Sequence, residues 1–227
     1  MITFRLSRSL KLLSFHSEIN KDEKNTSTVS RPSLQTLSDL IFGLALSIGA
    51  IELIGQQPTG VDQVIESLSI FGFGFYLLVT VWYRYASIMK IMVFETTTLV
   101  TINLVLLFLV AIEPYLLNIL ILGSSAVPAK SINDPVSQLY AFDFGSIYVV
   151  LAYFLHQVVK QEKKLGNTKH LTNYRRYIYF LVIAAVFYIS ILPFFGNITF
   201  SYFSLRQLIW LSFLPIGVIF RIAGWFG

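Results

Sequence analysis

The sequence contains no cysteine among its 227 residues, and only 13% of them are charged. The absence of cysteine excludes disulfides, thiolate metal sites and a cysteine nucleophile. The three histidines, His16, His156 and His170, lie far apart, and the chain has no HExxH spacing. The motifs of phosphate-binding loops and of serine hydrolases are also missing. We therefore expect that the protein is not an enzyme and needs no metal or cofactor.

Apolar residues dominate the composition instead. They make up 55% of the chain, and the mean hydropathy is +0.69. Such values are typical of a polytopic membrane protein. A membrane-spanning helix needs roughly 20 apolar residues, and runs of about that length predict six spans. They cover residues 34–54, 64–85, 97–122, 138–159, 177–195 and 202–225. We expect an all-α fold, with a basic tail over residues 1–33 and a six-helix transmembrane domain over residues 34–227.

Two short features refine this prediction. Arg31-Pro32-Ser33 resembles a helix start, since proline is tolerated in the first turn of a helix. Gly72 and Gly74 lie within the second span, where small residues allow helices to approach closely.

Charged residues interrupt the N-terminal segment, so it does not have the form of a signal peptide.

The distribution of lysine and arginine predicts the orientation. With this set of spans, 15 of the 17 basic residues fall on one side, and only Lys130 and Arg206 fall on the other. Basic residues accumulate in cytoplasmic loops. Both termini are therefore expected in the cytoplasm, with the connections over residues 123–137 and 160–176 on opposite sides of the membrane. The localisation would be the cell membrane if the source is prokaryotic.

The first span carries a carboxylate near each end, Asp39 and Glu52. A charge within a bilayer costs about 3 kcal/mol at the centre and less near an interface, so such residues suggest a helix packed in protein or beside water. Two faces follow from the helical period. The face predicted to pack on other helices has small residues, and its members are Asp39, Gly43, Leu46 and Ala50. The opposite, aliphatic face suits lipid, a protein core, or an apolar constriction in a symmetric oligomer, and its members are Leu37, Ile41, Leu44, Ile48 and Ile51.

Two further acidic residues, Glu113 and Asp143, lie near the outer ends of the third and fourth spans. They could be solvated at the interface or could pair with Lys130 or Arg206. Together with Asp39 and Glu52 they allow an alternative function, a proton- or ion-coupled secondary transporter. A membrane scaffold without transport activity is a third class.

One pattern in the first span resembles a known family. Ser38-Asp39-x-x-Phe42-x-Leu44-Ala45-x-Ser47, followed by Glu52, is similar to the first helix of the transmembrane protein 175 family, which comprises lysosomal and prokaryotic potassium channels. Trp82 resembles a tryptophan at the inner end of the second helix, and Asn103 with the residues up to Pro114 resembles the third helix. The likeness covers about residues 34–119. Spans four to six are similar only in number and length to single-repeat prokaryotic members.

The sequence also departs from the family pattern. The family arginine that lies six residues before the aspartate would be at Ser33, and the nearest arginine is Arg31. Leu37 replaces a phenylalanine. Tyr83, Arg84 and Tyr85 follow Trp82 where family members often have histidines.

The resemblance implies a homo-oligomer, a tetramer in prokaryotic members, whose first helix lines a central pore. Its constriction would be Leu44, with Ile48 and Ile51 on the same face. The Ser47 hydroxyl would contact the cation. A helix-end network would contain Ser38, Asp39, Arg31, Trp82 and Asn103. Glu52 would concentrate cations at the outer mouth or form a packing hydrogen bond. The expected function is a potassium-preferring cation channel, with potassium ions, lipid and further copies of the chain as partners and no nucleic acid.

Overall fold

The computed structural model describes residues 31–55, 60–92, 97–125, 130–166, 170–200 and 203–213. The chain divides into two compact units, residues 1–37 and 38–227. In the first unit, the described residues, 31–37, are helical. Most of the predicted N-terminal tail lies outside the described residues, so the expected boundary after residue 33 stays a prediction. The following description concerns the second unit and the helix that leads into it.

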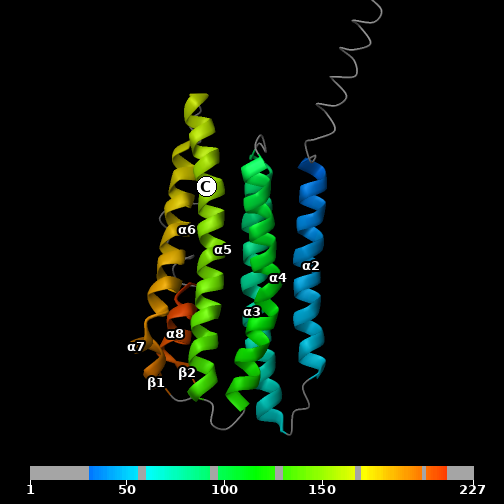
Figure 1. The fold of residues 1–227 in the computed structure, drawn as a ribbon, viewed down its shortest axis with the longest axis vertical. Helices are drawn as coiled ribbons and strands as arrows, with labels where there is room; N and C mark the ends of the chain where they lie inside the picture. Colours follow the sequence, from blue (N-terminus) through cyan, green and yellow to red (C-terminus); the bar gives the residue numbers. More distant parts are fainter. Residues whose placement is uncertain are drawn as a thin grey trace, which may run out of the picture. The chain divides into compact units, whose positions relative to one another are not determined.

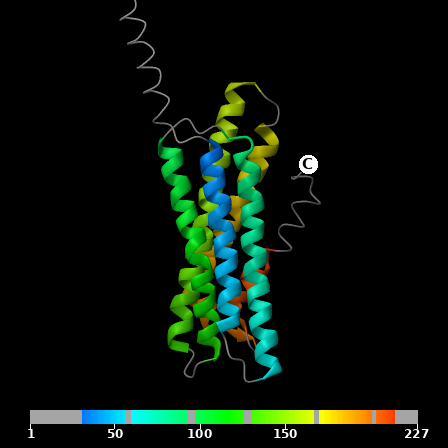
Figure 2. The same cartoon turned by 90° about the vertical axis from the view of Figure 1, so that its right-hand side faces the viewer.

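The described residues are predominantly α-helical, as the sequence predicts. The long helices are α2 (Arg31–Gly55), α3 (Val61–Met89), α4 (Thr97–Ser125), α5 (Lys130–Lys164) and α6 (His170–Ser190). Consecutive helices from α3 to α6 run in alternating directions side by side (Figures 1 and 2). Helix α2 is described from Arg31 onward, so the predicted helix start at Arg31-Pro32-Ser33 stays a prediction.

Four described helices are long and apolar enough to cross a membrane, and they lie within α2, α3, α4 and α5. The protein is therefore a multi-pass membrane protein. The first four predicted spans each fall inside one of these helices. The count of six spans is not established by the described residues and stays a prediction.

The fifth predicted span, 177–195, is wrong at its C-terminal end. Helix α6 ends at Ser190, and a separate short helix, α7 (Pro193–Asn197), begins at a proline. Proline lacks the N–H that would continue the α6 ladder. The paired strands β1 (Thr199–Phe200) and β2 (Phe203–Ser204) then precede α8 (Leu205–Leu211). The predicted sixth span, 202–225, therefore starts with a strand, and its residues after 213 lie outside the described part.

Two predicted connections are mostly helical. Helix α5 continues to Lys164 and α6 begins at His170, so most of the basic segment 160–176 belongs to helices. On the other side, α4 extends to Ser125 and α5 begins at Lys130, with Pro135 inside the helix. Apolar runs determine the membrane-crossing part of a helix, whereas helices can continue beyond the bilayer in polar sequence.

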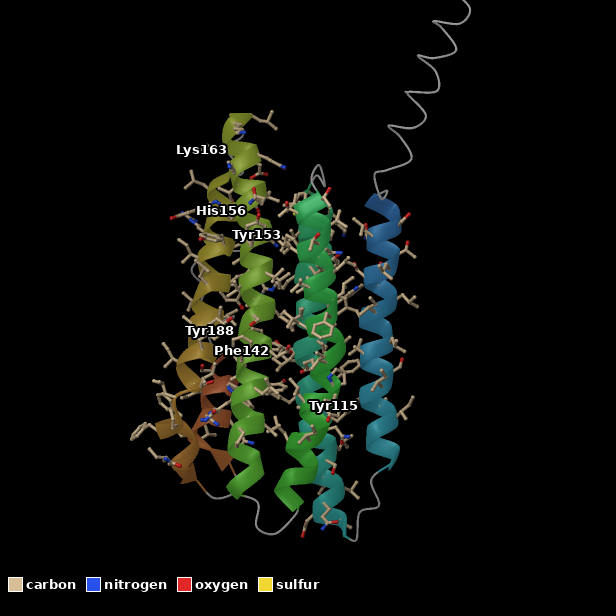
Figure 3. All side chains as sticks on the ribbon, in the orientation of Figure 1. Tyr115, Phe142, Tyr153, His156, Lys163 and Tyr188 are labelled. Atoms are coloured by element: carbon tan, nitrogen blue, oxygen red, sulfur yellow. The ribbon has the colours of Figure 1, made fainter. Side chains whose placement is uncertain are left out.

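The core of the second unit extends over all its long helices, and a cluster of aromatic rings lies between α5, α6 and α8. Phe144 packs on Phe187 with ring centroids 4.7 Å apart, and Tyr140 packs on Trp210 at 4.9 Å. Phe142 and Tyr188, labelled in Figure 3, add a further contact between α5 and α6 at 5.9 Å. By contrast, 22% of the most apolar window in α2 is buried, against 56% in α5. Helix α2 is thus the least covered of the four candidate spans.

Glycine supports close packing between α3 and α4 at one position. A Cβ atom added at Gly74 would overlap the Cδ2 atom of Leu117. This contact confirms the predicted close approach at Gly74. A Cβ atom added at Gly72 would have no other atom within 4 Å. Gly72 therefore does not allow a close approach among the described residues of this chain.

Candidate pore helix and its polar networks

Helix α2 packs on the rest of the second unit through one narrow face. Ser38, Phe42 and Ala45 are almost fully buried. Gly49 continues this face, since a Cβ atom there would lie 3.5 Å from the ring of Phe71. Successive members of this face are four, three and four residues apart, a spacing that keeps them on one side of a helix.

The prediction of which face of α2 packs on the other helices is wrong within this chain. The buried residues are shifted by one position from the predicted ones, which were Asp39, Gly43, Leu46 and Ala50. Asp39 and Gly43 are exposed, and a Cβ atom at Gly43 would meet nothing within 4 Å. Leu46 is half-buried and packs against the core. The neutral hydroxyl of Ser38 occupies the buried position, because a carboxylate would cost more to bury. Each buried residue therefore lies one position before the predicted one.

The opposite side of α2 carries an exposed face, which we define as Leu40, Gly43, Leu44, Ser47 and Ile51. Leu44 is 57% exposed and Ile51 is 65% exposed. This face contains three of the residues that the resemblance assigns to a pore: Leu44, Ser47 and Ile51. The fourth, Ile48, is only half-exposed.

Ile48 faces α4 across an apolar surface groove of about 220 Å³. The groove is lined from α2 by Ile41, Leu44, Ala45 and Ile48, and from α4 by Leu104, Leu107, Phe108 and Ala111. The predicted aliphatic stripe is therefore divided. Ile41, Leu44 and Ile48 line the groove, although Leu44 is also mostly exposed, and Ile51 projects from the exposed face.

Ser47 has a defined hydroxyl orientation. Its Oγ donates a hydrogen bond to the Gly43 carbonyl at 2.8 Å, one turn back in the same helix. A hydroxyl has one proton and two acceptor lone pairs. Because the proton is used within the helix, the oxygen lone pairs can accept a contact from outside it. An exposed cation could thus be contacted by Ser47 without breaking a helix bond.

A neutral hydrogen-bond chain, which we call the inner network, ties the first turns of α2 to α3 and α4. Tyr85 Oη lies 2.6 Å from Ser38 Oγ and donates to Asn103 Oδ1 at 2.8 Å. All three residues are fully buried. Beside this chain, Trp82 Nε1 donates to Asp39 Oδ1 at 2.9 Å. The structure therefore brings together Ser38 with Asn103 and Asp39 with Trp82.

Tyr85, which joins the network, was not among the predicted site residues. Sequence reasoning placed it only as one of the residues that replace family histidines after Trp82. The available signal was its position three residues after Trp82, which sets both side chains on adjoining parts of one helix face. Its ring also packs on Phe42 at 5.7 Å. For Arg31 and Glu52, the helix backbone is described, but the side chains lie outside the described part.

A second polar cluster, which we call the outer network, lies between the middle of α4 and the first half of α5. Tyr140 Oη donates to Glu113 Oε1 at 2.8 Å, and Asp143 lies one turn further along α5. Glu113 is 0% exposed and Asp143 is 4% exposed. The expectation that these carboxylates are solvated at an interface is therefore wrong. They lie at a contact between helices.

Arg206 contributes a buried cation to the same region. Its Nε donates to the Ser190 carbonyl at 2.7 Å, and its Nη2 donates to the Leu192 carbonyl at 3.3 Å. Its Nη1 donates to Ser137 Oγ on α5. The last carbonyls of a helix have no partner within the helix, so Arg206 satisfies the end of α6 and joins it to α5. Trp210 Nε1 completes the cluster by donating to Ser190 Oγ at 3.0 Å.

Comparisons with known proteins find a solved structure with the same fold. No protein-family model and no curated protein matches the sequence. Among solved structures, the chain is similar to a variant of the potassium channel MtTMEM175 in complex with a nanobody–MBP fusion protein. The TM-score is 0.57, the sequence identity is 18%, and the match covers 87% of this chain and 94% of that chain. The chain therefore has the fold of that channel, as the resemblance in α2 to α4 implied.

Proposed function

We propose that the protein is a cation channel in which several copies of the chain surround a pore lined by the exposed face of α2. One observation carries the proposal: α2 is anchored by a polar network on one side and leaves an apolar face with a single hydroxyl, Ser47, on the other. One face of one helix cannot enclose a pore, so a ring of copies is required. The fold shared with a potassium channel supports this function and a preference for potassium.

Permeation in this proposal is passive. A ring of Leu44 side chains narrows the pore, and an apolar constriction raises the cost of passing a hydrated ion. Ser47, three residues further along the same face, offers an oxygen lone pair to an ion that has lost part of its water. Ile51 extends the apolar lining by one more turn. Ile48 as a pore residue and Glu52 at the outer mouth remain predictions from the resemblance.

The inner network determines which face of α2 is left free. A helix rotated by one residue would move Ser38 away from Tyr85 by 100° and would bury Asp39 instead. The bonds of Ser38 and Asp39 to α3 therefore fix the rotation of α2, which in turn fixes the direction of Leu44. In this role Asp39 is structural and does not contact the ion.

The arrangement favours a channel over a coupled transporter. Carriers commonly place their charged groups near the membrane midplane at broken helices. Here Asp39 lies near one end of its span, bonded to Trp82, whereas Glu113 lies near the middle of α4 and contacts Tyr140 on α5, the helix that also carries Asp143. These carboxylates are not gathered around one site.

Recording from the purified chain in a planar bilayer tests the function. A potassium gradient should produce unitary current steps, with a reversal potential closer to that of potassium than to that of sodium. A flux of potassium into vesicles without unitary steps would show a carrier. Neither current nor flux, from protein that is folded and inserted, would contradict both transport functions.

The proposed orientation, with both termini in the cytoplasm, is tested separately in this cysteine-free chain. Leu165, between α5 and α6, is 82% exposed, and Phe194, at the start of α7, is 64% exposed. In intact cells, Leu165→Cys should resist an impermeant thiol reagent and Phe194→Cys should react. The reverse labelling would invert the topology.

A further inference from the structure

Two arginines from helices far apart in sequence meet near one end of the second unit. Arg84 lies in the last turns of α3, and Arg176 lies in the second turn of α6. Arg84 Nη2 donates a long hydrogen bond to Tyr179 Oη at 3.4 Å, and Arg176 Nη2 donates a long one to Ser87 Oγ at 3.5 Å. Each arginine thus reaches a residue one helical turn from the other arginine. This reciprocal geometry places the two guanidinium groups close together.

Both groups are partly withdrawn from solvent, and each is half-buried. The guanidinium of Arg84 lies over the ring of Tyr179, 4.8 Å from its centroid. For Arg176, which precedes the predicted fifth span, burial and then the charge of Arg84 lower the pKa of the guanidinium. Two cations held together at low solvent exposure repel each other, and an anion placed between them would offset that repulsion.

Exposed aromatic side chains mark the depth of this pair in the membrane. Trp82, Tyr83 and Tyr174 are 39%, 65% and 49% exposed, and they flank Arg84 and Arg176 in sequence. Tryptophan and tyrosine are enriched at the headgroup level of bilayers, where one part of the ring is apolar and the other is wet. The arginine pair therefore lies at the level of lipid headgroups, at the end that the orientation argument assigns to the cytoplasm.

We infer that Arg84 and Arg176 form a binding site for the phosphate headgroup of an anionic lipid, with the Ser87 hydroxyl beside it. Guanidinium groups match phosphate because they present several N–H donors in a planar fork. Basic pockets between transmembrane helices at the cytoplasmic side bind such headgroups. The site joins α3 to α6 at a point that is separate from the exposed face of α2, so it is a site for regulation or assembly by lipid and not part of the pore.

Native mass spectrometry of the full chain, purified in the presence of phosphatidylglycerol, tests this site. The wild-type protein should retain the lipid. Arg84→Gln and Arg176→Gln should each lower the retained phosphatidylglycerol about fivefold, which is the expected effect of one basic residue at a membrane surface. Arg175→Gln is the matched control, because Arg175 is the adjacent arginine on the same helix and is exposed. Its effect should stay below about twofold. Equal losses in all three variants, or none in any, would overturn the inference.

Two further measurements keep the test independent of folding. Arg176→Lys preserves the charge and should retain more lipid than Arg176→Gln, while the elution volume in size exclusion reports whether each variant is folded. In the wild-type protein, phosphatidylcholine should not displace phosphatidylglycerol, and neither should inorganic phosphate at the same concentration. Displacement by inorganic phosphate would assign the site to a free anion and would contradict a lipid site.

Discussion

The inner and outer networks hold their helices in different ways. The outer network contains a charged group, Arg206, which is bonded to the end of α6 and to Ser137 on α5, and its carboxyl group, Glu113, is bonded to Tyr140. The fully buried chain of the inner network uses neutral groups, Ser38, Tyr85 and Asn103. Bonds to charged groups contribute about 1.5–3 kcal/mol each and neutral ones about 1 kcal/mol. The core around α5 and α6 is therefore fixed more firmly than α2.

This difference separates a scaffold from a candidate moving part. Helices α5, α6 and α8 share a cluster of packed aromatic rings as well as the buried Arg206. Helix α2 has a narrow buried face, a short hydrogen-bond chain and a free face. Because lipid is as apolar as leucine, burying more of α2 against the chain would gain little from the hydrophobic effect. A helix held this way could shift without disturbing the scaffold.

Removing Arg206 should have the largest effect on stability. Arg206→Leu leaves the Ser190 and Leu192 carbonyls without their donor and should destabilise the fold on the order of 3 kcal/mol. Thermal unfolding in detergent measures the loss. Arg175→Leu, which removes an exposed arginine, is the control and should change the midpoint little. If both substitutions have equal effects, Arg206 does not stabilise the outer network as described.

The inner network should respond more weakly to loss of its central hydroxyl. Tyr85→Phe keeps the ring on Phe42 but leaves Ser38 and Asn103 without their shared partner. Leaving buried polar groups unsatisfied costs about 1–3 kcal/mol. The same unfolding experiment should show this cost for Tyr85→Phe and almost none for Tyr83→Phe, whose ring is exposed. A loss as large as that of Arg206→Leu would show that α2 is held as firmly as the scaffold.

The glycine pair in α3 tests the packing that supports both networks. In Gly74→Ala, the new methyl group must displace the Leu117 side chain, and overpacking of this kind costs about 1 kcal/mol. Gly72→Ala meets open space and should be neutral or stabilising, since alanine is the better helix former. The difference between the two midpoints is the measurement. Equal midpoints would show that Leu117 moves aside without cost.

The sequence predicted the helices better than their faces. Runs of apolar residues correctly predicted where α2 to α5 lie in the sequence, because a helix that crosses a membrane needs a minimum length of apolar chain. They could not select the buried face of α2, because Asp39 and Ser38 are only 100° apart and an aliphatic residue suits both lipid and core. Tyr85 and Arg206 were missed as network members for a related reason. A tyrosine or arginine near a span end is also typical of the interface, and only tertiary contacts show that both are buried.

The smallest effect on stability is expected at Leu44, where the effect on conduction should be greatest. Leu44 is mostly exposed, so Leu44→Ala should leave the unfolding midpoint nearly unchanged, while a wider and wetter constriction should raise the unitary conductance and reduce discrimination between potassium and sodium. Leu68→Ala on α3 is the matched control, because Leu68 is 55% exposed, close to the 57% of Leu44. A lipid-facing leucine should alter neither current nor selectivity.

Leu46→Ala adds a second control, since Leu46 packs on the core and its loss should lower stability without changing selectivity. If Leu46→Ala changes selectivity and Leu44→Ala does not, the pore face of α2 lies on the other side of the helix. If Leu44 and Leu68 behave alike, the exposed face contacts lipid, and the proposed pore must be lined by other residues.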